Sequence, residues 1–420
     1  MTTSNTVATL PEELYILVFK QLPGFRDVCE CSRVCRRWRV FADSDPVWGA
    51  LLRQNLVNTS DDDLRNYIDD SHARLPKNKR IFATWYQRYR GFTDSYTRMR
   101  RAVQKLEIWA HDHSPQLLRS LSPGLGWMGS ESVPVRELLR VVSDSPAMRD
   151  FLMAYHMHDG QRRQERFLDF GLFGSYLCYG EFCSLSWLSS RMLQVVAMGQ
   201  FKILVFAWCN TTRNYLGILV DCPASCTQQI LHHVVQLQPQ SFRFVDKGLF
   251  GDFFSEYVDA LADGHHDIDN GVICMMPNRG PNTSTSVSHG IRTTVSVMFC
   301  SDETSRFRVY RYQVTFEIVD PEELGFDSVQ LKDRHWLVHY SDEQLAQSGG
   351  PGVIGQLPVL SRESPYYRYC SRMQDEEGGP AVVAFEGHFT MVPGTLEEPL
   401  GQDMILFVPY VEVPMPLEVL

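Results

Sequence analysis

The 420-residue sequence lacks long hydrophobic runs. Its longest unbroken apolar stretch lies around Ile203–Cys209, far short of the roughly 20 residues that cross a bilayer as a helix. The N-terminus has no basic segment followed by an apolar one, so no secretory signal is expected. Apolar residues make up 44% and charged residues 21% of the chain, which excludes wholesale disorder and a bare coiled coil. This length and composition predict roughly two to four globular domains.

The sequence also lacks common catalytic and metal-binding motifs. G-x-S-x-G, H-E-x-x-H and Walker-type G-K-[ST] do not occur, and the 11 cysteines form no C-x-x-C pair. The cysteine spacings fit no zinc template and favour buried free thiols in a reducing compartment. His265–His266, followed by Asp267 and Asp269, offers metal-ligating side chains, but a loop of this kind fixes no geometry. We therefore expect no catalytic residue, no metal and no cofactor.

The charge is unevenly distributed. Residues 1–100 hold 16 Lys+Arg and 12 Asp+Glu, whereas the rest of the chain holds 24 and 38, and the net charge is −10. An acidic body argues against binding a phosphate backbone. We expect neither nucleic acid nor membrane as a partner.

The first 50 residues have the pattern of short helices. Apolar residues recur at i, i+3 and i+4 spacing and so share one helical face: Leu10, Leu14, Leu17, Val18 and Leu22. Pro11 and Glu12–Glu13 suit the first turn of a helix. A second helix is predicted around Val28–Cys35, with Trp38 one turn further and Trp48 after Asp45–Pro46.

The middle of the chain is predicted to be mixed α+β. Tyr96–Trp109 has helical spacing, and Ser145–Pro146 begins another helix with Gly160 as its C′ terminator. Lys202–Cys209 and Tyr215–Val220 favour strands, and Phe253–Leu261 a closing helix. The stretch that follows, DGHHDIDNG and then PNRGPNTSTS, has a loop-like composition.

The last third alternates with the period of β-strands. In Arg308–Val319, apolar or aromatic residues occupy every second position from Tyr310 to Ile318, which excludes a single amphipathic helix face. Similar patterns occur in Ile291–Phe299, Trp336–Tyr340, Val383–Met391 and Met404–Val413, with Val383, Phe385, Phe389 and Met391 expected to point inward. Strands at this spacing, with Gly/Pro turns, predict an antiparallel sandwich.

A glycine-rich loop is the candidate ligand or substrate loop of this region. Gly350, Gly352 and Gly355 have the G-x-G-x-x-G spacing of dinucleotide sites, but Pro358 and the β-branched residues leave no helix to bind a pyrophosphate. A hairpin that uses positive φ is favoured. A backbone nest for an anion is the alternative.

The N-terminal pattern L-P-E-E-L, then C-S-R-V-C-R-R-W, then D-P-V-W closely resembles the F-box. A helical unit of about 45 residues is near the lower limit for folding alone and leaves apolar side chains for a partner. The resemblance implies binding to the Skp adaptor and, through it, to a cullin scaffold. The adaptor-binding residues it implies are Leu10, Pro11, Leu14, Val18, Leu22, Val34, Cys35 and Trp38. Trp48 is expected to close the F-box internally.

Two further resemblances follow along the chain. Residues 96–262 resemble a SUKH-type domain, through His158-Asp159-Gly160-Gln161 and Gly251-Asp252-Phe253-Phe254. Residues 281–420 resemble an ApaG domain, through Arg334-His335-Trp336, the Gly350–Gly355 turn and Gly387-His388-Phe389-Thr390-Met391. The order of the three is similar to that of the F-box only protein 3 family.

We therefore expect a multidomain α+β protein. It comprises a helical F-box (5–52), a helical linker (53–95), a mixed α+β SUKH-like domain (96–262), an interdomain loop (263–280) and an antiparallel, fibronectin type III-like ApaG sandwich (281–420).

The function that the resemblance implies is that of a non-catalytic substrate-recognition subunit of a Skp–cullin–F-box ubiquitin ligase. It would bind an unidentified protein substrate through the ApaG-like or SUKH-like domain, in the cytoplasm or nucleus. Two alternatives remain. One is a small-ligand protein or enzyme that binds an anion or pyrophosphate through the ApaG-like domain, and the other is an F-box protein that acts outside any ligase.

Overall fold

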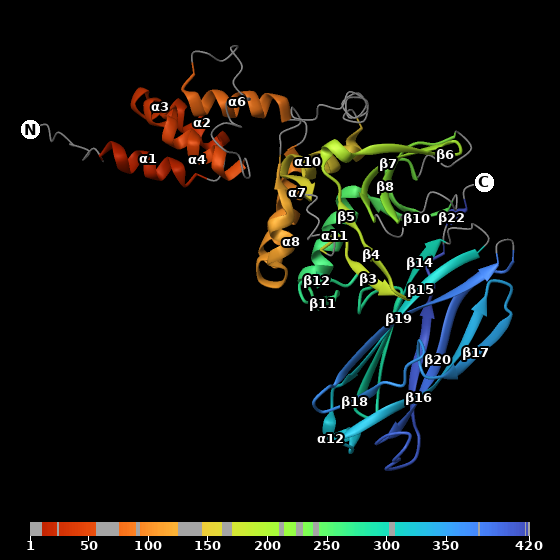
Figure 1. Cartoon of the computed structure of the whole chain (residues 1–420). Coiled ribbons are helices and arrows are strands. Elements are labelled where there is room, and N and C mark those ends of the chain that lie inside the picture. The colour runs from red at the N-terminus through yellow and green to blue at the C-terminus, as the bar shows by residue number, and fades with distance from the viewer. Residues whose placement is uncertain are drawn as a thin grey trace, which may run out of the picture. The chain divides into compact units, whose positions relative to one another are not determined.

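The computed structural model describes residues 11–22, 25–55, 75–89, 93–124, 145–161, 170–209, 214–223, 230–237, 243–301, 307–376, 379–415 and 417–418. The chain forms two compact units, coloured from red to blue along the chain in Figure 1. The N-terminal unit comprises Met1–Arg100, Pro123–Gly129 and Leu152–His158; the C-terminal unit comprises Arg101–Ser122, Ser130–Phe151 and Asp159–Leu420. In the described part of the chain, no helix is long and apolar enough to cross a membrane.

The N-terminal unit begins with short helices: α1 (Glu12–Lys20), α2 (Phe25–Val34), α3 (Arg36–Ala42), α4 (Asp45–Asn55) and α6 (Lys77–Tyr89). Cys35 is extended and separates α2 from α3, and its Sγ accepts a hydrogen bond from the Trp38 amide. Trp48 is buried and donates to the Ala42 carbonyl over 2.7 Å. The prediction that Trp48 closes this helical region internally is confirmed.

Helix α6 lies in the stretch expected to be a linker, and it packs on α4. The Asn78 amide donates to the Asp45 carboxylate over 2.9 Å, and Phe82 meets the Trp48 ring at 5.1 Å between centroids. Ile81 and Phe82 are buried. Because the apolar side of α6 is covered in this way, α6 is part of the packed N-terminal unit.

The described residues in the central part of the chain include the α-helices α7 (Thr93–His113), α8 (Pro115–Ser120), α10 (Arg149–Met157) and α11 (Phe250–Ala262). Its main sheet has the order β22-β10-β9-β8-β7-β5, with β6 beside β7. The bounds are β5 (Ser186–Trp187), β6 (Gln194–Met198), β7 (Phe201–Trp208), β8 (Tyr215–Asp221), β9 (His233–Leu237), β10 (Arg243–Leu249) and β22 (Leu417–Glu418). Leu417 and Glu418 of β22 thus return to pair with β10. Shorter strands are β1 (Leu121–Pro123), β2 (His158–Gln161), β3 (Ser175–Cys178), β4 (Glu181–Ser184), β11 (Ile268–Asp269) and β12 (Val272–Ile273).

Aromatic packing and one buried amide hold the central part of the C-terminal unit together. Phe250 of α11 meets Phe151 and Phe206 edge to face, with centroids 5.2 and 5.5 Å apart. The Gln161 carboxamide accepts from the amides of Leu172 and Trp187 at 3.0 and 2.9 Å. Its nitrogen donates to Ser120 and Phe170, each over 2.8 Å. Gln161 thus satisfies its full hydrogen-bonding capacity, which gives the His158–Gln161 motif a structural role.

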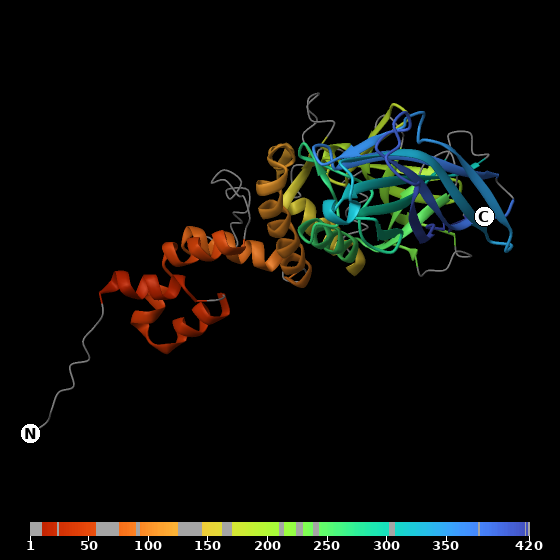
Figure 2. The ribbon, with the colours of Figure 1, turned by 90° about the horizontal axis from the view of Figure 1, so that it is seen from below.

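The C-terminal sandwich consists of two antiparallel sheets that lie face to face in Figures 1 and 2. One sheet has the order β13 (Thr283–Ser288), β14 (Ile291–Ser301), β15 (Phe307–Ile318) and β19 (Tyr366–Glu376). The other contains β16 (Ser328–Tyr340), β17 (Leu345–Pro351), β18 (Val359–Ser361), β20 (Val382–Pro393) and β21 (Met404–Glu412), and α12 (Pro321–Leu324) connects β15 to β16. Phe316 and Phe389 meet across the core at 4.8 Å. The predicted sandwich is confirmed.

Two local predictions are wrong. Val383 is only half-buried, because the register between β16 and β20 shifts between His339 and Tyr340, which pair with Ala384 and Val382, and these two residues are buried instead. Gly160 does not terminate a helix: α10 ends at Met157 and Gly160 lies in β2 at φ +67°. A Cβ there would lie 2.3 Å from the Leu188 carbonyl oxygen, so close backbone approach explains this glycine.

Candidate functional site

One face of α1 presents apolar side chains to solvent. Leu14, Leu17 and Val18 have exposed fractions of 42%, 53% and 56%. Their i, i+3, i+4 spacing puts them on the same side of the helix, and we call these three residues the α1 stripe. A folded protein rarely leaves clustered apolar side chains exposed unless they bind a partner.

The opposite face of α1 is anchored by aromatic rings. Tyr15 stacks on Phe41 with centroids 5.0 Å apart, and Phe19 meets Trp38 edge to face at 5.6 Å. Glu12 and Glu13 lie in the first turn and Lys20 in the last, which suits the helix dipole. Since rings fix the inner face, the α1 stripe is held in place without being covered.

The other predicted adaptor-binding residues are distributed around these helices. Pro11, Val34 and Cys35 are exposed, whereas Leu22 and Trp38 are half-buried. Leu10 lies outside the described residues. Trp38 packs against the inner face of α1, so it supports the stripe as well as reaching the surface. The sequence pattern did not single out Val40 of α3, which is exposed too.

The glycine-rich loop is a tight hairpin, as predicted. Val353 and Gln356 exchange backbone hydrogen bonds of 2.9 and 2.8 Å around Ile354 and Gly355, whose φ angles are +44° and +75°. Two successive positive φ angles are typical of a type I′ turn. The amide of Gly352 donates to the Lys332 carbonyl. These backbone amides therefore serve the hairpin and do not converge on an anion.

The nearby cations are also engaged. Arg362 pairs with Asp327 at 3.4 Å, and Arg368 pairs with Asp269 at 2.8 Å. Arg334 donates to the Gly352 carbonyl over 2.6 Å. Each guanidinium stabilises the protein's own carboxylates or backbone around the loop.

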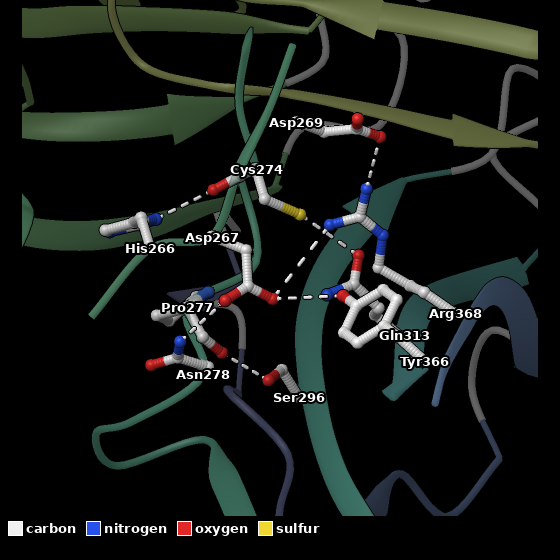
Figure 3. Close-up of polar contacts among 10 residues, drawn as sticks. All are labelled: His266, Asp267, Asp269, Cys274, Pro277, Asn278, Ser296, Gln313, Tyr366 and Arg368. Atoms are coloured by element: carbon white, nitrogen blue, oxygen red, sulfur yellow. Dashed lines mark hydrogen bonds and ion pairs between the residues drawn. The ribbon is translucent and has the colours of Figure 1, made fainter. Parts of the chain in front are cut away.

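The histidine- and aspartate-rich segment joins the central region to the sandwich (Figure 3). The His266 ring donates from Nδ1 to the Cys274 carbonyl over 2.8 Å. Asp267 accepts from the Asn278 side-chain amide at 2.8 Å and from the Tyr366 hydroxyl at 3.4 Å. Within the described ranges, no three His, Cys, Asp or Glu side chains come together as metal ligands. Three of the side chains considered as ligands, His266, Asp267 and Asp269, thus make structural contacts.

Burial favours the neutral forms of three groups in this network, His266, Cys274 and Tyr366. It lowers the pKa of His266 and raises that of the Cys274 thiol, which donates to the Gln313 side chain over 3.1 Å. Burial also raises the pKa of Tyr366 to about 12, in spite of the opposing charge of Arg368.

Comparison with known proteins matches both ends of the chain. An F-box-like family model matches residues 7–54, and an ApaG domain model matches residues 300–393. The F-box only protein 3 of Bos taurus is 22% identical over 413 residues, covering 92% of this chain and 79% of the relative. The F-box protein SKIP16 of Arabidopsis thaliana is 23% identical over 442 residues, covering 94% of this chain and 95% of the relative. Protein ApaG of Shewanella frigidimarina is 35% identical over 57 residues, covering 14% and 43%.

The helices around α1 and the C-terminal sandwich are therefore an F-box-like domain and an ApaG domain in one chain, with a β-rich region between them. Along most of its length the chain is a homologue of proteins named F-box only protein 3.

Proposed function

We propose that this chain is the substrate-recognition subunit of a Skp–cullin–F-box ubiquitin ligase. The F-box-like domain binds the Skp adaptor, and the C-terminal unit holds a protein substrate. The chain catalyses nothing itself. Holding the substrate near the ubiquitin-charged enzyme raises the effective concentration of its lysines there.

The observation that carries this proposal is the α1 stripe within the matched F-box-like region. Leu14, Leu17 and Val18 are exposed although the helix beneath them is fixed by Tyr15 and Phe19. Covering each side chain with an apolar partner would contribute about 1.5–3 kcal/mol. The proposed adaptor face comprises the stripe together with the residues predicted from the sequence: Leu10, Pro11, Leu22, Val34, Cys35 and Trp38.

The test is quantitative capture of the Skp adaptor by the full chain. Leu14→Asp with Val18→Asp removes two apolar contacts, so we expect binding to weaken about a hundredfold or more. Val287→Asp is the matched control, because Val287 of β13 is as exposed as Val18 and belongs to the sandwich. It should leave capture unchanged.

A folded wild-type chain that captures no adaptor would contradict the proposal. Equal loss in the Val287→Asp variant would also contradict it, since the effect would then be general. Adding the cullin scaffold to the captured complex separates a ligase subunit from an F-box protein that acts elsewhere: only the former assembles with it.

A further inference from the structure

An open cavity of about 630 Å3 lies in the C-terminal unit, where the β-rich region meets the ApaG sandwich. Its lining comes from the β3–β4 hairpin, the β11–β12 hairpin, the strands β15 and β19, and the tip of the glycine-rich loop. The volume is that of a typical ligand pocket. Neither region forms the cavity alone.

The walls of this cavity are mainly apolar and aromatic. Leu177 and Tyr179 of the β3–β4 hairpin are 62% and 60% exposed although they line it, and Phe182 and Tyr369 add rings. The Tyr179 hydroxyl and the Ser371 hydroxyl are 2.8 Å apart, which ties the hairpin tip to β19. The apolar surface is therefore held open in a fixed shape.

The glycine-rich loop contributes Ile354 to the lining. Ile354 has a φ of +44°, a conformation that β-branched residues rarely adopt. Strained residues of this kind persist where the surrounding structure demands them, and they cluster at binding sites. The loop singled out from the sequence thus acts through Ile354 and not through glycine amides.

Among the described residues that line the cavity, Asp269 and Arg368 are charged, and they differ in exposure. Asp269 has a side chain 59% exposed, whereas its partner Arg368 is 21% exposed and also lies 3.9 Å from Asp267. Two further arginines stand against the tyrosines of the wall, Arg311 over Tyr176 and Arg372 over Tyr179, and neither lines the cavity. The Asp269 carboxylate accepts from Arg368 at 2.8 Å and from the Asn270 side-chain amide at 2.9 Å. Each carboxylate oxygen can accept a further hydrogen bond, so Asp269, the more exposed of the two charged groups, complements a cation.

We propose that this cavity binds an exposed segment of the protein substrate, inserting a large apolar side chain next to a lysine or arginine. The apolar side chain packs against Leu177, Tyr179 and Ile354, and the basic residue pairs with Asp269. This assignment rests on the proposed function and names the chemistry of the substrate segment.

The test uses the full chain purified with the Skp adaptor and three fluorescein-labelled octapeptides that differ at two central residues, Phe-Lys, Ala-Lys and Phe-Glu, each flanked by Gly and Ser. Fluorescence anisotropy measures binding. We expect the Ala-Lys peptide to bind at least about tenfold more weakly than Phe-Lys, because the apolar contact is lost. We expect Phe-Glu to bind about threefold more weakly, the range of an exposed ion pair.

Two variants with matched controls locate the site. Leu177→Ser should weaken binding of the Phe-Lys peptide about tenfold. Leu400→Ser, at a similarly exposed leucine, should leave binding unchanged. Asp269→Asn should abolish the preference for Lys over Glu. Asp403→Asn breaks an exposed ion pair with Lys332 of the same 2.8 Å length and should leave the preference intact.

Three outcomes would overturn the proposal: no saturable binding of Phe-Lys up to about 1 mM, unchanged binding by the Leu177→Ser variant, or preference for the Phe-Glu peptide. Because the adaptor is present in the sample, a chain that keeps the adaptor and ignores the peptides refutes the cavity assignment alone. A chain that binds the peptides and loses the adaptor refutes the ligase function alone.

Discussion

Helix α1 and strand β15 both carry regular apolar patterns, and the molecule uses the two patterns differently. On α1, one side of the helix packs inward through Tyr15 and Phe19, and the α1 stripe stays about half exposed. On β15, Tyr310, Val314 and Phe316 are fully buried in the sandwich. The second face of β15 is covered as well, since Arg311 and Gln313 are also buried.

The two regions obtain their stability in different ways. The sandwich covers its apolar residues with its own sheets, so a change there should be felt as lost folding free energy. The α1 stripe contributes little to folding because water still reaches it. Its apolar surface is available to a partner, and changes there should be felt as lost binding.

The largest change in the free energy of unfolding is expected for Phe389→Ala. Phe389 is fully buried and contacts Phe316 and Trp336, at 4.8 and 5.3 Å between centroids. Its loss leaves a cavity and should cost about 3–5 kcal/mol of unfolding free energy. Leu17→Ala on the α1 stripe should change stability by less than about 0.5 kcal/mol. Hydrogen exchange of amides in β20 and α1 measures both, and comparable losses would abolish the distinction.

A somewhat smaller effect is expected from a charged pair inside the sandwich. Arg308 and Asp375 lie 2.6 Å apart with side chains only 6% and 3% exposed. Arg308→Met leaves the carboxylate buried without its cation, which should cost about 3 kcal/mol. The control is Arg292→Met, which breaks an exposed pair with Glu317 at 2.7 Å and should cost about 1 kcal/mol or less. Thermal unfolding of the two variants measures both losses. Equal decreases in the unfolding temperature would show that burial of the pair does not matter.

The sequence predicted the strands and the α1 stripe because both depend on local periodicity. The alternation in Arg308–Val319 led directly to β15, and the heptad-like spacing of Leu14, Leu17 and Val18 to one helical face. It could not predict that Arg311 and Gln313 are buried. The residues that contact them come from elsewhere in the chain: Cys274, 39 positions away, donates to Gln313, and the ring of Tyr176 packs against the Arg311 guanidinium.

The glycine-rich loop reaches the cavity through a residue that the sequence pattern did not indicate. Glycine spacing drew attention to Gly350, Gly352 and Gly355, and the hairpin they form was predicted. The residue that reaches the cavity is Ile354, which no glycine pattern identifies. Only long-range packing brings Ile354 near Leu177 and Arg368, so the cavity itself lies beyond sequence periodicity.

A gain in stability is expected at this loop, in contrast to the losses in the core. Ile354→Gly removes the strain of a β-branched side chain at φ +44°, worth about 1 kcal/mol. Leu357→Gly is the matched control: Leu357 is similarly exposed and has no positive φ, so it should lose about 0.5–1 kcal/mol. Denaturant unfolding measures both. If Ile354→Gly lowers the free energy of unfolding as much as Leu357→Gly does, the turn is unstrained.

The smallest effect is a pH dependence on the outer face of the sandwich. His335 of β16 and His388 of β20 are register partners with rings stacked 4.6 Å apart. Partial burial, and then the charge of His335, lower the pKa of His388 below its ordinary value. A lowered folded-state pKa means that the unfolded chain binds the proton more readily. Stability should therefore be full above about pH 6.5, the unfolded value, and fall as the pH drops through it.

His335→Gln tests the cause of this dependence, because it removes the neighbouring charge and leaves β16 paired with β20. The pKa of His388, followed by its ring resonances, should rise toward the ordinary value, and the loss of stability on acidification should shrink. A His388 pKa that does not move would assign the shift to burial alone. The stability of the pair would then depend on burial, as in the rest of the sandwich. The α1 stripe would remain the region where exposed side chains affect binding.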